Sequence, residues 1–128
     1  MRTDFGEPPF DGYESKLNRG RMKKIYLACP YSHEDPAVCD QRFRSANQMA
    51  AHLMSKGNIV FSPLSHSHPI SLCLGNSLDH DFWLAQDRAF VEWCDAIYVY
   101  RMQGWEESRG VQREIKWAKD LGKEVKYI

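Results

Sequence analysis

Ser108-Arg-Gly-Val-Gln-Arg-Glu114 is the stretch from which the fold of this chain is best inferred. An apolar run, 96–100, precedes it, and apolar residues at helical spacing follow it along 111–121. A strand, a connecting loop and a helix in this order are how open α/β proteins place backbone N–H groups at the carboxyl edge of a sheet. The stretch therefore predicts a ligand-binding site at the start of a helix over 108–121.

Within this stretch, Ser108 is a favourable N-cap residue, and Gly110 lets a ligand approach the amides of the first turn. Glu114 lies three residues after Val111 and four before Ala118, so helical geometry places it at the edge of the stripe that faces the protein. A carboxylate at that position is a candidate for catalysis. The alternative is a glutamate that points to solvent in an early turn, where the helix dipole favours negative charge.

Strands and helices alternate along the rest of the chain. The apolar patterns predict strands at Lys24–Ala28, Ile59–Phe61, 96–100 and 124–128, and helices at 37–56, 79–94 and 108–121. Strand–helix–strand units of this kind favour right-handed crossovers and parallel pairing. The sequence therefore predicts an α/β fold, a flavodoxin-like or Rossmann-like three-layer sandwich with a parallel sheet of four to five strands.

Two segments show no regular period. Residues 1–22 are rich in Gly, Pro and charge, which predicts an N-terminal arm or disordered extension before a domain at 23–128. Ser62 to His80 is predicted as a long irregular loop that forms a wall or lid over a pocket. His66 and His68 in this loop lack a nearby Cys or carboxylate partner, so substrate contacts or loop hydrogen bonds are favoured over a metal.

Composition excludes several classes of protein. The 128 residues suffice for one domain, and 43% hydrophobic residues argue against disorder of the whole chain. Lys plus Arg and Asp plus Glu are both 17, and this zero net charge argues against a nucleic-acid partner. No apolar run approaches the roughly 20 residues of a membrane span. The four cysteines show no C-x-x-C spacing, so we expect free thiols, no metal site and a cytoplasmic location.

A second carboxylate occupies an apolar position. Asp87 lies between Trp83 and Phe90 on the face of the second predicted helix that should pack on the protein. Buried carboxylates are seldom tolerated without a partner or a function. The structural alternative to a functional role is a hydrogen bond to a backbone amide or an ion pair with Arg42 or Arg44.

Three pieces of the chain, in this order and spacing, resemble the nucleoside 2-deoxyribosyltransferase superfamily, which includes the 2′-deoxynucleoside 5′-phosphate N-hydrolases. The resemblance covers about 23–128. It rests on Lys24-Ile-Tyr26, on Asp87 with seven residues between it and its D-x7-D partner Asp95, and on Ser108-x-Gly110-Val-x-x-Glu114. An uncharacterised bacterial and phage branch of the superfamily is more similar. That similarity rests on Ala28-Cys-Pro-Tyr-Ser32, Phe61-Ser-Pro63, Ser65-His-Ser-His-Pro69 and Gly104-Trp-Glu-Glu-Ser-Arg-Gly110.

The resemblance implies cleavage of the N-glycosidic bond of a (2′-deoxy)nucleoside 5′-monophosphate or nucleoside, by hydrolysis or base exchange. Glu114 would attack C1′ and form a covalent glycosyl ester, and Asp87 would contact or protonate the departing base. The hydroxyl of Tyr26 would hold Glu114, although a strand tyrosine that packs on a helix is its simpler role. The reaction needs no cofactor, and the resemblance implies a homodimer or larger homo-oligomer.

Substrate-binding residues are expected at the same edge of the sheet. Ser108 and the amides of Gly110 and Val111 suit a 5′-phosphate, and Arg109 and Arg113 either add contacts or are solvated helix charges. Trp105 and Phe61 either stack on the base or pack in the core. The further substrate-binding candidates are Cys29, Pro30, His66 and His68.

Two rival functions use the same fold. One is a non-catalytic nucleotide-binding or sensor module, and the other is a flavodoxin-like interaction domain with an empty site. Paired carboxylates favour the enzyme, because binding alone does not need them. Gln112, where the superfamily usually has a second Gly, favours the sensor.

Overall fold

A four-stranded parallel sheet organises the part of the chain that the structure describes. The computed structural model describes residues 22–75 and 80–128, so all of the predicted arm except Met22 lies outside the described residues. The elements are β1 (Lys24–Ala28), α2 (Pro36–Ser55), β2 (Ile59–Phe61), α3 (Pro63–Cys73), α4 (His80–Trp93), β3 (Ala96–Val99), α5 (Arg109–Asp120) and β4 (Glu124–Tyr127). The sheet has the order β2-β1-β3-β4 and every pair is parallel. The predicted α/β class and parallel sheet are confirmed.

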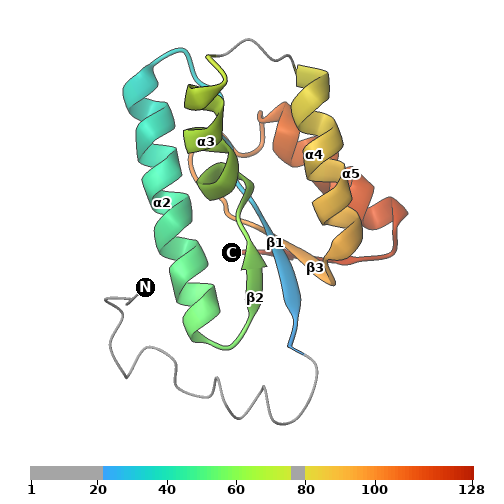
Figure 1. The fold of residues 1–128 in the computed structure, drawn as a ribbon. Coiled ribbons are helices and arrows are strands. Elements are labelled where there is room, and N and C mark those ends of the chain that lie inside the picture. The colour runs from blue at the N-terminus through green and yellow to red at the C-terminus, as the bar shows by residue number, and fades with distance from the viewer. Residues whose placement is uncertain (1–21, 76–79) are drawn as a thin grey trace.

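Strand β1 lies inside the sheet with a helical layer on each face. Helices α2 and α3 cover one face, and α4 and α5 cover the other (Figure 1). Side chains alternate between the faces of a strand. Ile25 and Leu27 therefore pack with the α2–α3 layer, whereas Tyr26 and Ala28 pack with the α4–α5 layer. This alternation directs Tyr26 towards the two helices that carry the candidate carboxylates.

Helix α3 corrects the sequence analysis. The segment from Ser62 to His80 was predicted as an irregular loop, but residues Pro63–Cys73 form a helix. The prediction was wrong because Pro69 inside the segment and its run of Ser and His disfavour a helix locally. Pro63 suits the first helical turn, and buried Leu64 together with contacts to α2 supplies the tertiary stabilisation.

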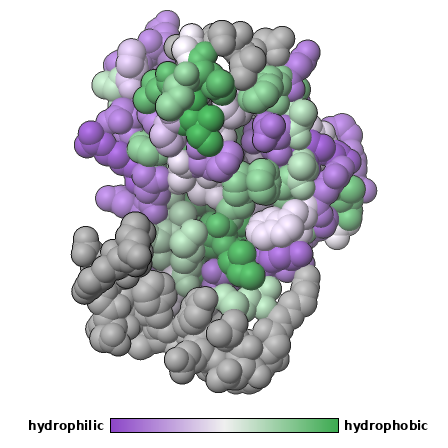
Figure 2. Space-filling model, in the orientation of Figure 1, coloured by the Kyte–Doolittle hydropathy of each residue, from purple (hydrophilic) through white to green (hydrophobic). Residues whose placement is uncertain are grey.

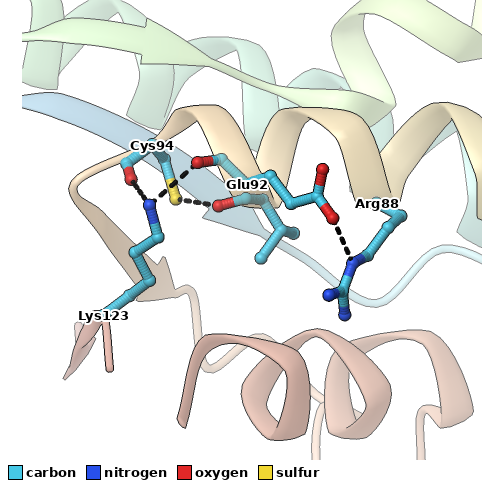
Figure 3. A network of polar contacts seen from close by, with 5 residues as sticks. Arg88, Glu92, Cys94 and Lys123 are labelled. Carbon is cyan, nitrogen blue, oxygen red and sulfur yellow. Dashed lines mark hydrogen bonds and ion pairs between the residues drawn. The ribbon is translucent and has the colours of Figure 1, made fainter. Parts of the chain in front are cut away.

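The C-terminal end of α4 is tied to the turn between α5 and β4 (Figure 3). The Nζ atom of Lys123 donates hydrogen bonds to the backbone carbonyls of Glu92, at 2.8 Å, and Cys94, at 2.6 Å. Arg88 forms an ion pair with Glu92 at 2.9 Å one turn earlier. Carbonyls at a helix end lack intrahelical partners, so the lysine both satisfies them and complements the helix dipole. These bonds hold in place the helix that carries Asp87.

The surface shows apolar side chains at the end of α3, where Ile70, Leu72 and Leu74 are exposed (Figure 2). The cysteines are free thiols, with Cys29 and Cys94 buried. No helix within 22–75 and 80–128 has the length and apolar character required to cross a membrane. The predicted start of the α4 helix at Asp79 lies outside the described residues.

Candidate active site

A cavity of about 1270 Å³ opens at the carboxyl ends of β1 and β3. Its walls come from the loops that follow these two strands and from α2, α3, α4 and α5. Ligands of open parallel sheets bind in this position, and pockets for small molecules commonly measure about 300–1,000 Å³. The cavity is therefore large enough for a nucleotide.

Glu114 of α5 lines the cavity and is only 7% exposed. The alternative of a solvent-facing glutamate is therefore wrong. Tyr26, which is fully buried on β1, donates a hydrogen bond from its hydroxyl to Oε2 of Glu114. Because one oxygen is held by the phenol, the orientation of the carboxylate is set by the central strand. Tyr26 also packs against Phe61, with ring centroids 5.9 Å apart.

Burial dominates the electrostatics of Glu114. Loss of solvent raises the pKa of this carboxyl to about 8, and the negative charge of Asp87 adds to the rise. The hydrogen bond from Tyr26 and the positive charge of Arg113 oppose it, because both stabilise the ionised form. Burial also raises the pKa of Tyr26 well above its usual value, so the phenol keeps its proton and remains a donor.

Asp87 of α4 lines the same cavity and is half-buried. Burial raises its pKa to about 6. Among the described residues, Asp87 forms no hydrogen bond or ion pair. The ion pair of Asp87 with Arg42 or Arg44 that the sequence suggested as an alternative does not form. Arg42 binds backbone carbonyls, and Arg44 pairs with Asp40 at 2.9 Å. The site thus has two carboxyl groups whose different surroundings separate their pKa values.

The first turn of α5 forms another wall. Ser108 caps the helix, and its Oγ accepts a hydrogen bond from the amide of Val111 at 3.2 Å. The Val111 amide predicted to bind an anion is therefore already engaged, and its side chain is buried in the core. Ser108, Arg109 and Gly110 line the cavity. A Cβ atom added to Gly110 would meet only the Ser108 Oγ, at 3.9 Å, so the protein itself leaves the space above this glycine open.

The two histidines of α3 have different neighbours. His68 lines the cavity, where its Nδ1 is hydrogen-bonded to the hydroxyl of Tyr31 at 2.6 Å and its ring lies 4.5 Å from that of Phe43. His66 is exposed, does not line the cavity, and lies 5.3 Å from the ring of Phe61. The structure therefore brings only His68 to the candidate site. Within 22–75 and 80–128, no three His, Cys, Asp or Glu residues are grouped to hold a metal.

The other candidates divide between wall and core. Cys29 lines the cavity, whereas Pro30 is buried outside its lining. Trp105 packs against the core and lies 5.7 Å from Tyr127, so core packing describes it better than base stacking. The ring of Phe61 is likewise stacked on that of Phe90, with their centroids 3.7 Å apart.

Sequence reasoning missed that Tyr31 and Arg42 line the cavity. Their partners lie 37 and 61 residues away in the chain, and no local pattern signals such distant bonds.

Comparisons with known proteins give three findings. A family model described as "Domain of unknown function (DUF1937)" matches residues 23–128. No curated protein sequence matches significantly. Among solved structures, a 2-deoxyribosyltransferase from Bacillus psychrosaccharolyticus matches with a TM-score of 0.59 and 22% identity, over 81% of this chain and 70% of that chain.

A second solved structure, a 2-deoxyribosyltransferase (desoxiribosyltransferase) from Leishmania mexicana, matches with a TM-score of 0.57 and 19% identity. The match covers 83% of this chain and 63% of that chain, so this chain spans less than two thirds of the Leishmania protein. At these identities the likeness shows a shared fold.

Proposed function

The chain belongs to the DUF1937 family, which falls within the nucleoside 2-deoxyribosyltransferase-like superfamily, and from this we propose that it cleaves the N-glycosidic bond of a 2′-deoxynucleoside 5′-monophosphate or nucleoside. The observation that carries the proposal is the buried hydrogen bond from Tyr26 to Glu114 in a cavity that Asp87 also lines. Two carboxyl groups that line one cavity supply a nucleophile and an acid. With a pKa of about 6 for Asp87 and about 8 for Glu114, the reactive form, with the proton on Asp87, is the less populated of the two singly protonated forms. The proposal needs no cofactor.

In the first step, the ionised carboxylate of Glu114 attacks C1′ of the sugar. Tyr26 holds Oε2, which leaves Oε1 as the attacking atom. The C1′–N bond breaks, its electron pair passes to the base, and a glycosyl ester of Glu114 forms. The hydrogen bond from Tyr26 supports this role because it stabilises the ionised carboxylate inside a buried site.

Asp87 supplies the proton that the departing base needs. Burial raises the pKa of Asp87 to about 6, so the group retains a proton closer to neutral pH than an exposed aspartate. In the second step the Asp87 carboxylate takes a proton from water as the water attacks C1′, which releases the sugar and regenerates Glu114. A second base that attacks C1′ instead gives transfer. Both routes retain configuration, because each consists of two displacements.

The first turn of α5 supports a monophosphate substrate. The hydroxyl of Ser108 and the amides of Arg109 and Gly110 lie at the positive end of the helix dipole, beside the cavity. Ser108→Ala is therefore expected to weaken binding of a deoxynucleoside monophosphate more than binding of the matching deoxynucleoside. Equal losses of affinity for the two ligands, measured by calorimetry, would show that Ser108 does not bind a phosphate.

Base release from a panel of deoxynucleosides and their 5′-monophosphates tests the proposed activity. We expect release with the wild type and none with Glu114→Gln, which keeps the size of the side chain. Glu106→Gln is the matched control, because Glu106 is exposed and does not line the cavity. Addition of a second free base separates transfer from hydrolysis by whether a new nucleoside appears.

A nucleotide sensor without turnover is the second candidate. The observation that favours it is the raised pKa of Glu114, about 8, because a neutral carboxyl is a poor nucleophile. Tight nucleotide binding without base release by the wild type across pH 6–9 would establish the sensor. The homodimer or larger assembly implied by the resemblance stays a prediction, which light scattering of the full chain tests.

A further inference from the structure

Arg42 of α2 joins the two loops that wall the cavity. Its Nη1 donates a hydrogen bond to the carbonyl of Ser32, in the loop after β1, at 3.1 Å. Its Nη2 donates to the carbonyl of Gln103, in the loop after β3, at 2.9 Å. All three residues line the cavity. One planar guanidinium therefore links two loop residues, Ser32 and Gln103, that lie 71 positions apart in the chain.

Gly104 makes room for this bridge. Its φ is +92°, a conformation that side chains other than glycine rarely adopt. A Cβ atom at this position would lie 2.6 Å from Nη2 of Arg42, which is too close for two non-bonded heavy atoms. The glycine is therefore required twice, once by the backbone turn and once by the passing guanidinium.

The charge of Arg42 is not neutralised by a carboxylate among the described residues. Its hydrogen-bond partners are two backbone carbonyls, whereas Arg44, two positions later on the same helix, pairs with Asp40. A guanidinium has five N–H donors, and these bonds use two of them. Half-buried Arg42 thus brings both a positive charge and spare donors to the cavity wall.

The two bridged loops lead to both halves of the candidate site. The loop that contains Gln103 and Gly104 continues to Ser108, the N-cap of α5. The loop that contains Ser32 also contains Tyr31, which is bonded to His68. Movement of either loop would displace the groups that meet the substrate, and hydrogen bonds weaken steeply when their geometry is lost.

We propose that Arg42 is a positioning residue that fixes the loop before Ser108 against the loop after β1, and that this arrangement sets the affinity for a phosphate-bearing substrate. The inference rests on the proposed function for its substrate, but the bridge itself does not. Arg42 acts through the loops and through its charge, and the bond-breaking step does not involve it.

The experiment compares Arg42→Gln and Arg42→Lys with Arg44→Gln, the matched control for loss of charge on α2. Hydrogen–deuterium exchange of the ligand-free protein measures the rate of amide exchange in the loops at 31–35 and 101–107. We expect faster exchange in both loops for the two Arg42 variants, because lysine cannot reproduce the two-pronged geometry, and no change for Arg44→Gln. KM for a deoxynucleoside monophosphate should rise about tenfold while kcat changes less than about twofold.

Gly104→Ala provides an independent route to the same defect. Its Cβ displaces Nη2 of Arg42, so the variant should also loosen both loops and raise KM. In the Arg42→Gln background, Gly104→Ala should have a smaller effect than in the wild type, because the contact with the guanidinium is already gone and only the backbone strain remains. An equal effect in both backgrounds would show that Gly104 acts apart from Arg42 and would overturn the bridge.

Unchanged exchange in both loops for Arg42→Gln also overturns the proposal. Loosened loops with an unchanged KM would overturn the link between the bridge and substrate affinity. If the wild type releases no base, the proposed activity fails. The exchange data then still test whether Arg42 holds the two loops together, and calorimetry with the monophosphate tests whether this bridge affects affinity.

Discussion

The hydroxyl of Tyr26, on the central strand, donates a hydrogen bond to the buried carboxylate of Glu114, which lies 88 residues later in the chain. The bond connects the most buried part of the sheet to the wall of the cavity. Because a strand inside a sheet is the most rigid place to anchor a donor, this pair is preorganised before any ligand arrives.

Tyr26→Phe is expected to lower kcat/KM about 10- to 100-fold. Removal of the hydroxyl group takes away a hydrogen-bond donor that stabilises the ionised carboxylate, so the pKa of Glu114 should rise further. Steady-state kinetics at several pH values would show the loss together with an upward shift of the limb that reports Glu114. Tyr127→Phe, on the exposed edge strand, is the control. An unchanged pH profile in Tyr26→Phe would contradict the assigned role.

The pH dependence of kcat/KM should be bell-shaped, with limbs near pH 6 and pH 8. The pKa of Asp87 is about 6 and that of Glu114 about 8, so the pair holds one proton between these values. The reaction needs that proton on Asp87 and an ionised Glu114, a state absent when both groups are protonated or both are ionised.

Asp87→Asn removes one member of the pair. The rate should fall about 100-fold and then only rise with pH through the pKa of Glu114. That pKa should itself be lower than in the wild type, since the charge of Asp87 that raises it is gone. A flat wild-type profile from pH 5 to 9 would exclude both carboxyl groups from the chemistry.

The stability of the fold should fall as pH rises. Glu114 binds its proton more tightly in the folded chain, with a pKa of about 8, than in the unfolded chain, with a value of 4.5. Between these values the unfolded state holds fewer protons, so the free energy of unfolding decreases with pH, by on the order of 5 kcal/mol for this group alone. Thermal unfolding of Glu114→Gln should lack this decrease. Glu106→Gln should retain it.

Gly110→Ala should fold as well as the wild type and bind phosphate less well. The added Cβ finds ordinary contact distance to Ser108, and alanine favours a helix more than glycine does. The methyl group would stand where a phosphate approaches the first-turn amides, so affinity for a deoxynucleoside monophosphate should fall about tenfold. Calorimetry and thermal unfolding check the two halves of this expectation. An equal loss for the nucleoside would place the phosphate elsewhere.

His68→Gln should change the preference among nucleobases. The bond to Tyr31 and the contact with Phe43 hold the imidazole at the cavity wall, where its other nitrogen can meet a polar edge of the base. A mismatched hydrogen bond at such a site alters the ratio of kcat/KM between two bases about tenfold or more. His66→Gln is the matched control because His66 does not line the cavity. Identical base preferences in all three proteins would exclude His68 from base recognition.

Local sequence pattern was sufficient for most of the fold. Strands Lys24–Ala28 and Ile59–Phe61 agree with the prediction, and α5 differs from it by one residue at each end. The apolar periods of these elements are local, so they can be recognised without knowledge of the neighbours. Helix α3 was missed because its stability comes from packing on α2 and not from its own residues.

The same division applies to the candidate site. Helical spacing placed Glu114 at the edge of the inner face of α5 and Asp87 on that of α4, and both line the cavity. Only the tertiary structure decided that His68, and not His66, lines the cavity. It also decided that the Val111 amide donates its hydrogen bond to Ser108 and that Arg42 bonds to two loops.

The sequence by itself therefore determined the parallel α/β architecture and placed Glu114 and Asp87 at or beside apolar faces of their helices, because both follow from periodicities of two and 3.6 residues along the chain. Only the folded chain decided which distant groups meet the carboxylates. The bond from Tyr26 to Glu114 and the raised pKa values of Glu114 and Asp87 depend on distance and on exclusion of water. Neither quantity is a property of any short stretch of sequence.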